Sequence, residues 1–140
     1  MQAVLGETFK TSKGLASIQE VQTAPLVALY FCTNWCPPCR IFTPQLWAVY
    51  AEANQFERKL EIVQVTLDKD ENDYSEYVPH TPWLLIPYKD PRIQELKKKY
   101  RVTAVPKLLV LNLDGSVGFS TGVEDVEKDG SGALDKWRSL

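Results

Sequence analysis

An unbroken apolar segment, Leu26 to Cys32, leads within a few residues to a pair of cysteines and then to a long amphipathic stretch. Such a run is typical of a strand that is buried on both faces of a sheet. Apolar residues then recur at the spacing of one buried helix face, which predicts a helix from Pro37 to about Asn54; they are Ile41, Phe42, Leu46, Val49 and Tyr50. A second apolar run, Leu60 to Leu67, predicts another strand. Strand, helix and strand in this order form a right-handed βαβ unit with parallel strands.

The flanking segments add further elements to this unit. We predict an edge strand over Val4 to Phe9, helices over Leu15 to Gln22, Asn72 to Val78 and Pro91 to Tyr100 (capped by Asp90), a hairpin of Lys107 to Leu113 with Val117 to Thr121 around Asp114-Gly115, and a closing helix over Leu134 to Leu140. A chain that begins with βαβ and ends with a hairpin is α/β, with a mixed central sheet flanked by helices on both faces. Residues 1–140 have the size of a single domain.

The motif Trp35-Cys36-Pro37-Pro38-Cys39-Arg40 stands between the first predicted strand and its helix. At a helix N-terminus, free backbone N–H groups and the positive end of the helix dipole favour a thiolate over a thiol. A second thiol one turn away can release whatever the first has attacked, through a mixed disulfide. The spacing therefore indicates dithiol–disulfide exchange, with Cys36 as the attacking thiolate and Cys39 as the resolving thiol.

Two other uses of this cysteine pair are less favoured. A zinc site needs two more nitrogen or sulfur ligands, and the remaining candidates are Cys32, inside a predicted strand, and the single histidine, His80. We therefore assign no metal and no cofactor. A structural disulfide is disfavoured because three cysteines without a leader do not resemble a disulfide-stapled secreted domain. We expect Cys32 to be a small buried hydrophobe.

The amino-acid composition indicates which kinds of molecule this chain is not expected to bind and where in the cell we expect it. An apolar content of 44% indicates a globular chain, and a net charge of −2 argues against broad nucleic-acid binding. No apolar run approaches membrane-spanning length, and the first residues lack the basic region of a secretory signal. We therefore expect a monomer in the cytoplasm, with the nucleus as the alternative, that binds neither nucleic acid nor membrane.

Three markers in order give the sequence a family resemblance. They are the cysteine motif continued by Phe42-Thr43-Pro44, the segment Pro82 to Tyr88, and Val105-Pro106. With these markers the chain resembles thioredoxin-like proteins from about Pro25 to Gly115, and within them the tryparedoxin–nucleoredoxin branch. The resemblance implies a three-layer thioredoxin-like fold, a cis peptide bond at Val105-Pro106 opposite Cys36, and a protein-disulfide reductase.

The resemblance also implies partners and contact residues. The electron acceptors would be disulfide-containing proteins, peroxiredoxin-type peroxidases among them, and the donor a low-molecular-weight dithiol or a reductase. The expected substrate-binding residues are Trp35, Pro37, Pro38, Trp83, Val105 and Pro106. For Trp83 a place in the core is an open alternative. The alternative function is a nucleoredoxin-like, redox-sensitive protein-binding module.

Two features of the sequence bear on the chemistry of the two thiols: the group that could take the proton of the resolving thiol, and the backbone N–H that could donate to the Cys36 sulfur. Smaller thioredoxins carry a buried aspartate that helps to move the proton of the resolving thiol, and Tyr30 stands at that position here. Water or an unassigned group would have to take its place. Pro37 and Pro38 have no N–H, so the first backbone donor available to the Cys36 sulfur is that of Cys39. We predict that this N–H points at the sulfur.

Overall fold

A computed structural model describes the backbone of residues 1–140 and all side chains except those of Gln2, Ala3 and Tyr77. The strands are β1 (Thr8–Thr11), β2 (Gly14–Ser17), β3 (Leu26–Cys32), β4 (Leu60–Thr66), β5 (Leu84–Leu85), β6 (Lys107–Leu111) and β7 (Val117–Phe119). They form one sheet in the order β2-β1-β5-β4-β3-β6-β7. β3, β4 and β5 are parallel, and the other neighbouring pairs are antiparallel. The mixed sheet confirms the predicted fold class.

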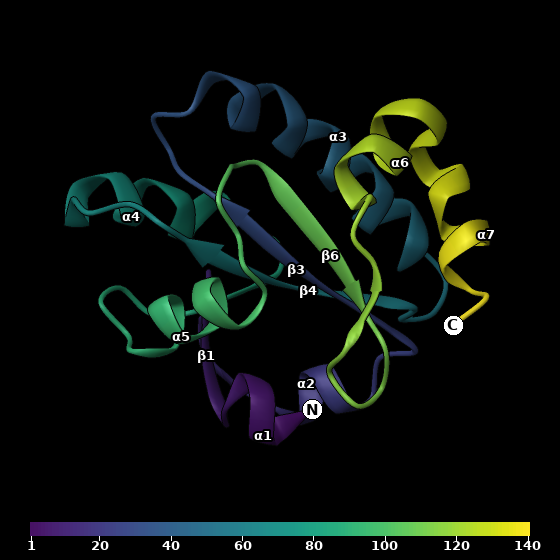
Figure 1. The fold of residues 1–140 in the computed structure, drawn as a ribbon, viewed down its shortest axis with the longest axis horizontal. Coiled ribbons are helices and arrows are strands. Elements are labelled where there is room, and N and C mark those ends of the chain that lie inside the picture. Colours follow the sequence, from purple (N-terminus) through teal and green to yellow (C-terminus); the bar gives the residue numbers. More distant parts are fainter.

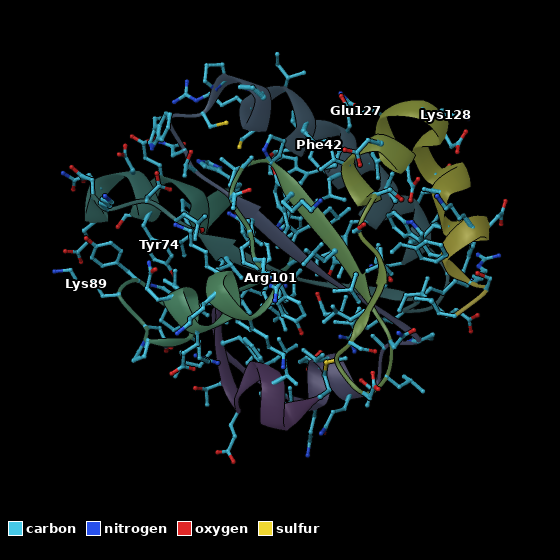
Figure 2. The ribbon with its side chains drawn as sticks, in the orientation of Figure 1. Phe42, Tyr74, Lys89, Arg101, Glu127 and Lys128 are labelled. Atoms are coloured by element: carbon cyan, nitrogen blue, oxygen red, sulfur yellow. The ribbon has the colours of Figure 1, made fainter. Side chains whose placement is uncertain are left out.

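Helices cover both faces of this sheet (Figure 1). The helices are α1 (Gln2–Leu5), α2 (Gln19–Gln22), α3 (Pro37–Ala53), α4 (Glu71–Tyr77), α5 (Arg92–Lys99), α6 (Gly122–Asp129) and α7 (Ala133–Trp137), with short 3-10 turns at Val78–His80 and Gly130–Gly132. α3, α6 and α7 lie on one side, and α1, α2 and α5 on the other. Two buried clusters match these layers, one including Phe42 and Trp137, the other including Phe9 and Leu96. Phe42 extends from α3 toward the sheet (Figure 2).

The central strands are buried along their whole length, as the apolar run predicted. Ala28 and Tyr30 of β3 enter the first cluster, whereas Leu29 and Phe31 enter the second. The carboxyl ends of β3 and β4 point to the same edge of the sheet, where α3 begins and α4 follows (Figure 1). This edge is where the cysteine motif lies.

The predictions for the N-terminal segment were wrong in part. The strand predicted over Val4 to Phe9 begins only at Thr8, because α1 ends at Leu5 and the chain turns at Gly6 (φ 84°) before β1. The first part of the helix predicted over Leu15 to Gln22 is β2, which pairs with β1 in a hairpin, and only Gln19–Gln22 is helical. Segments this short carry too few apolar positions for periodicity to separate helix from strand.

Most later predictions are confirmed within a few residues. The β6–β7 hairpin turns through Asp114-Gly115, with Gly115 at φ 90°. The Asp90 carboxylate accepts the Arg92 N–H at 2.9 Å, as expected of a cap at the start of α5. β5 and α6 were not predicted. Over the described residues, no helix combines the length and the apolar character needed to cross a membrane.

Candidate redox site

The cysteine motif folds as a helix start. Cys36 is the N-cap of α3 in an extended conformation (φ −78°, ψ 112°), and Pro37 and Pro38 occupy the first two helical positions. The Cys39 N–H donates to the Cys36 Sγ at 3.4 Å, which confirms the predicted contact. The three cysteines of the chain are all thiols, and Cys32 is buried in β3 as expected.

The two thiols of the motif differ in environment. Cys36 retains 6% of its surface exposed, whereas Cys39 has none. Burial raises the pKa of the Cys39 thiol to about 12, and its hydrogen bond with Cys36 acts in the same direction. The backbone N–H of Thr33 opposes this shift. Cys39 therefore remains a neutral thiol until its proton is removed.

The Val105-Pro106 peptide bond is cis and lies opposite Cys36, as the resemblance implied. The Cys36 thiol faces the carbonyl oxygen of Val105 at 3.9 Å. Val105 and Pro106 are half-buried, at the start of β6. The cis-proline loop thus lies directly beside the Cys36 sulfur.

Exposed apolar side chains surround the helix start. Trp35 is 66% exposed, and Pro37 and Pro38 are exposed beside it in the chain. Ile41, one turn into α3, is also exposed. This is a correction, because its spacing had placed it on the buried face with Phe42. Large exposed apolar side chains at a reactive site are typical of a surface that binds other proteins.

Trp83 lies in the core and not at the surface. It is 1% exposed, its indole N–H donates to Gln64 Oε1 at 2.8 Å, and its ring packs edge-on against Tyr30 and Tyr50. This position matches the core alternative. With so little exposed surface the side chain cannot contact a substrate beside Cys36, so the expectation that Trp83 is a substrate-binding residue is corrected.

Tyr30 links β3 to the first turns of α3 through hydrogen bonds that involve Thr43. The Thr43 hydroxyl donates to the Cys39 carbonyl at 2.8 Å, so the Tyr30 hydroxyl, 2.7 Å from Thr43 Oγ1, must be the donor in their bond. Burial raises the pKa of the Tyr30 phenol well above its ordinary value. Tyr30 therefore stays protonated and cannot act as the base that the aspartate of smaller thioredoxins supplies.

A hydrogen-bond network around Asn34 was not predicted. Its N–H donates to both carboxylate oxygens of Asp68, at 3.1 and 3.0 Å, and its side-chain amide donates to Glu76 at 2.6 Å. Its carbonyl accepts the Nε–H of Arg40 at 2.7 Å. One sequence signal could have found Asp68: it closely follows β4, and carboxyl ends of parallel strands meet at one edge of a sheet. We call these four residues the Asn34 network.

Among the described side chains, no group of three or more His, Cys, Asp or Glu residues is arranged to hold a metal ion.

Known proteins share this sequence and this fold. Residues 25–117 match the sequence model of the thioredoxin-like family. The tryparedoxin of Trypanosoma brucei brucei is 37% identical over 114 residues, which cover 79% of this chain and 78% of that protein. Probable nucleoredoxin 1 of Arabidopsis thaliana is 37% identical over 89 residues, 64% of this chain and 15% of that protein. The crystal structure of native tryparedoxin I from Crithidia fasciculata has a TM-score of 0.82 at 30% identity, covering 94% of this chain and 92% of that one.

A thioredoxin-like sheet with a thiol pair at a helix start defines a class of proteins, the thioredoxin-like oxidoreductases. The chain belongs to the thioredoxin-like family, in its tryparedoxin–nucleoredoxin branch. It spans 15% to 27% of the length of the first nucleoredoxins that it matches, whereas it spans most of the tryparedoxin.

Proposed function

We propose that this chain is a thiol–disulfide oxidoreductase that reduces disulfide bonds in other proteins, with Cys36 attacking and Cys39 resolving. The observation that carries the proposal is the unequal burial of two thiols held one helical turn apart. Cys36 lies beside the Val105 carbonyl and keeps some exposed surface, whereas Cys39 is fully buried and has a raised pKa. A thiol that stays protonated cannot compete as the first nucleophile.

The reaction runs in two displacements. The Cys36 thiolate attacks one sulfur of the substrate disulfide, so a Cys36–substrate bond forms, the substrate S–S bond breaks, and the leaving thiolate takes a proton. Cys39 then gives up its proton and attacks the Cys36 sulfur. The Cys36–Cys39 disulfide forms, the second substrate thiol leaves, and two electrons have passed from the dithiol to the substrate. A low-molecular-weight dithiol or a reductase would return them.

The surface around Cys36 supports a protein as substrate. Trp35, Pro37 and Pro38 present exposed apolar side chains on one side, and Val105 and Pro106 lie on the other. An extended segment carrying a disulfide would lie between them. We propose peroxiredoxin-type peroxidases as one class of acceptor, and a monomeric protein in the cytoplasm, with the nucleus as the alternative.

Reduction of insulin disulfides tests this proposal. With dithiothreitol as donor, the wild-type chain should accelerate the reaction, and Cys36→Ser should abolish the acceleration. Cys39→Ser should instead accumulate a mixed disulfide with insulin, visible by mass spectrometry. Cys32→Ser is the matched control, since it removes a buried thiol outside the motif. Trapping by the Cys36 variant and not by the Cys39 variant would reverse the two roles.

A redox-sensitive binding module is the second candidate, favoured by the similarity to nucleoredoxins and by the exposed Trp35 and Ile41. Such a module would reduce insulin slowly, and its affinity for a partner would change when Cys36 and Cys39 are oxidised. Turnover well above that of dithiothreitol alone argues against it.

A further inference from the structure

Three polar groups of Asn34, its backbone N–H, its backbone carbonyl and its side-chain NH2, are each engaged by a different part of the fold. The carboxylate of Asp68 follows β4, Glu76 belongs to α4, and Arg40 belongs to the first turn of α3. The turn around Asn34 leads directly to Cys36. Trp35, which lies between them, is largely exposed and adds little packing. Hydrogen bonds between Asn34 and three parts of the fold therefore help to fix this turn.

The same segment contacts the resolving thiol. Thr33, the residue before Asn34, directs its backbone N–H to Cys39. A shift of the segment would therefore alter the surroundings of both thiols at once. The hydroxyl of Thr33 is buried and, among the described side chains, is the polar group without a hydrogen-bond partner. Buried polar groups left unpaired in this way are uncommon in native structures.

Asp68 is the most buried member of the Asn34 network, with 8% of its surface exposed. Burial raises its pKa to about 6, although the Asn34 N–H lowers it, and the charges of Asp73, Asp70 and Glu76 raise it further. A carboxylate kept nearly buried beside a reactive pair is typical of a functional site.

We propose, on the basis of the function proposed above, that Asp68 is a positioning residue of the redox site: its carboxylate holds Asn34, and through Asn34 the turn that carries Trp35 and Cys36. Charge-assisted hydrogen bonds are roughly twice as strong as neutral ones. Ionised Asp68 therefore holds the turn more firmly than a neutral side chain of the same shape would.

This role makes the reaction rate depend on the charge of Asp68. Several titratable groups face Asp68: from the α4 side Asp70, Asp73 and Glu76, and from α3 Cys39. Asp68 also lines a cavity of about 450 Å³ next to α5, together with the charged residues Lys69, Lys89, Asp90 and Lys97. The cavity connects the carboxyl group with solvent, so it can exchange its proton. As the pH falls through about 6, Asp68 becomes neutral and its hold on Asn34 weakens.

The test compares Asp68→Asn with Glu71→Gln. Both substitutions remove one negative charge from the same region, but Glu71 is exposed at the start of α4. The reaction of the reduced protein with a small aromatic disulfide is followed from about pH 5 to pH 8. We expect Asp68→Asn to react about tenfold more slowly at pH 7, because a charged hydrogen bond is lost, and to lack the inflection near pH 6. Glu71→Gln should keep the wild-type rate and inflection.

Thermal unfolding of the same variants separates positioning from folding. Asp68→Asn should be at least as stable as wild type at pH 7, since it removes a buried charge. A wild-type rate and pH profile in Asp68→Asn would overturn the inference, as would a rate loss that follows a loss of folded protein. The proposed function fails separately, if the wild-type chain does not reduce insulin or if Cys36→Ser does.

Discussion

Replacement of Trp83 by Phe tests whether this residue serves the core or the substrate. The indole ring is buried between Tyr30 and Tyr50, with ring centroids 6.2 and 5.4 Å away and interplanar angles of 85° and 81°. Its N–H donates to the side chain of Gln64, which is itself fully buried. Phenylalanine keeps an aromatic ring in this place but is smaller and has no donor.

Two effects add to the cost of this substitution. Gln64 Oε1 would lose its indole donor in a site without access to solvent, which costs about 1–3 kcal/mol. The space left by the smaller ring costs about 1–2 kcal/mol more, by analogy with other large-to-small core changes. We therefore expect Trp83→Phe to lower the free energy of unfolding by about 2–5 kcal/mol in total.

Urea unfolding measures that loss, and insulin reduction at a temperature where the variant is folded measures its activity. Because Trp83 is buried in the core and does not form part of the exposed surface around Cys36, kcat/KM should stay within about twofold of wild type. Trp35→Phe is the matched control: it should change stability by less than about 0.5 kcal/mol, because Trp35 is exposed, and should raise KM. A Trp83→Phe variant with wild-type stability and a much higher KM would refute the assignment to the core.

Four further results are expected. Native iodoacetamide labelling at neutral pH, mapped by mass spectrometry, should modify Cys36 and spare Cys39, because burial raises the pKa of Cys39 to about 12; equal labelling would contradict this. Cys32→Ser should leave turnover intact and cost about 1–3 kcal/mol of stability in urea unfolding, since it buries a hydroxyl. Thr33→Val should raise stability by about 1 kcal/mol, because the hydroxyl it removes has no partner among the described groups. The pKa of Asp68 is higher in the folded chain than the ordinary 3.8, so the folded chain binds more protons between these values, and stability should fall as pH rises from about 4 to about 6; Asp68→Asn should remove that dependence.

The fold could be predicted where local pattern and burial agree. β3 and α3 were found almost to the residue, because an unbroken apolar run and a helical period are each long enough to be distinctive. The short N-terminal elements failed for the opposite reason. β5, with two residues, depends on its neighbours β4 and β1 for its existence, and no local period reports that.

Some residues of the site could be predicted from the sequence and others could not. Cys36 and Cys39 were found because their spacing and their place before a helix carry the chemistry directly. Trp83 could not be assigned from sequence, since an aromatic residue near a family marker fits the core and the surface equally well. Asp68 was missed because its role depends on a contact with Asn34, 34 residues away in the chain.

The Asn34 network and Tyr30 together explain how the site can lack the aspartate of smaller thioredoxins. At the sequence position where the resemblance to smaller thioredoxins would place that aspartate, this chain has a protonated Tyr30, which is linked to α3 through Thr43. The nearly buried carboxylate of this site has a different origin, because Asp68 lies two residues after the end of β4 and its carboxylate accepts hydrogen bonds from the turn before Cys36. Its charge also raises the pKa of Cys39, after the larger effects of burial and of Cys36. A negative charge at this place therefore adds to the effect of burial in keeping Cys39 protonated, and it also stabilises the turn that leads to Cys36. Both effects favour Cys36 as the first thiol to react.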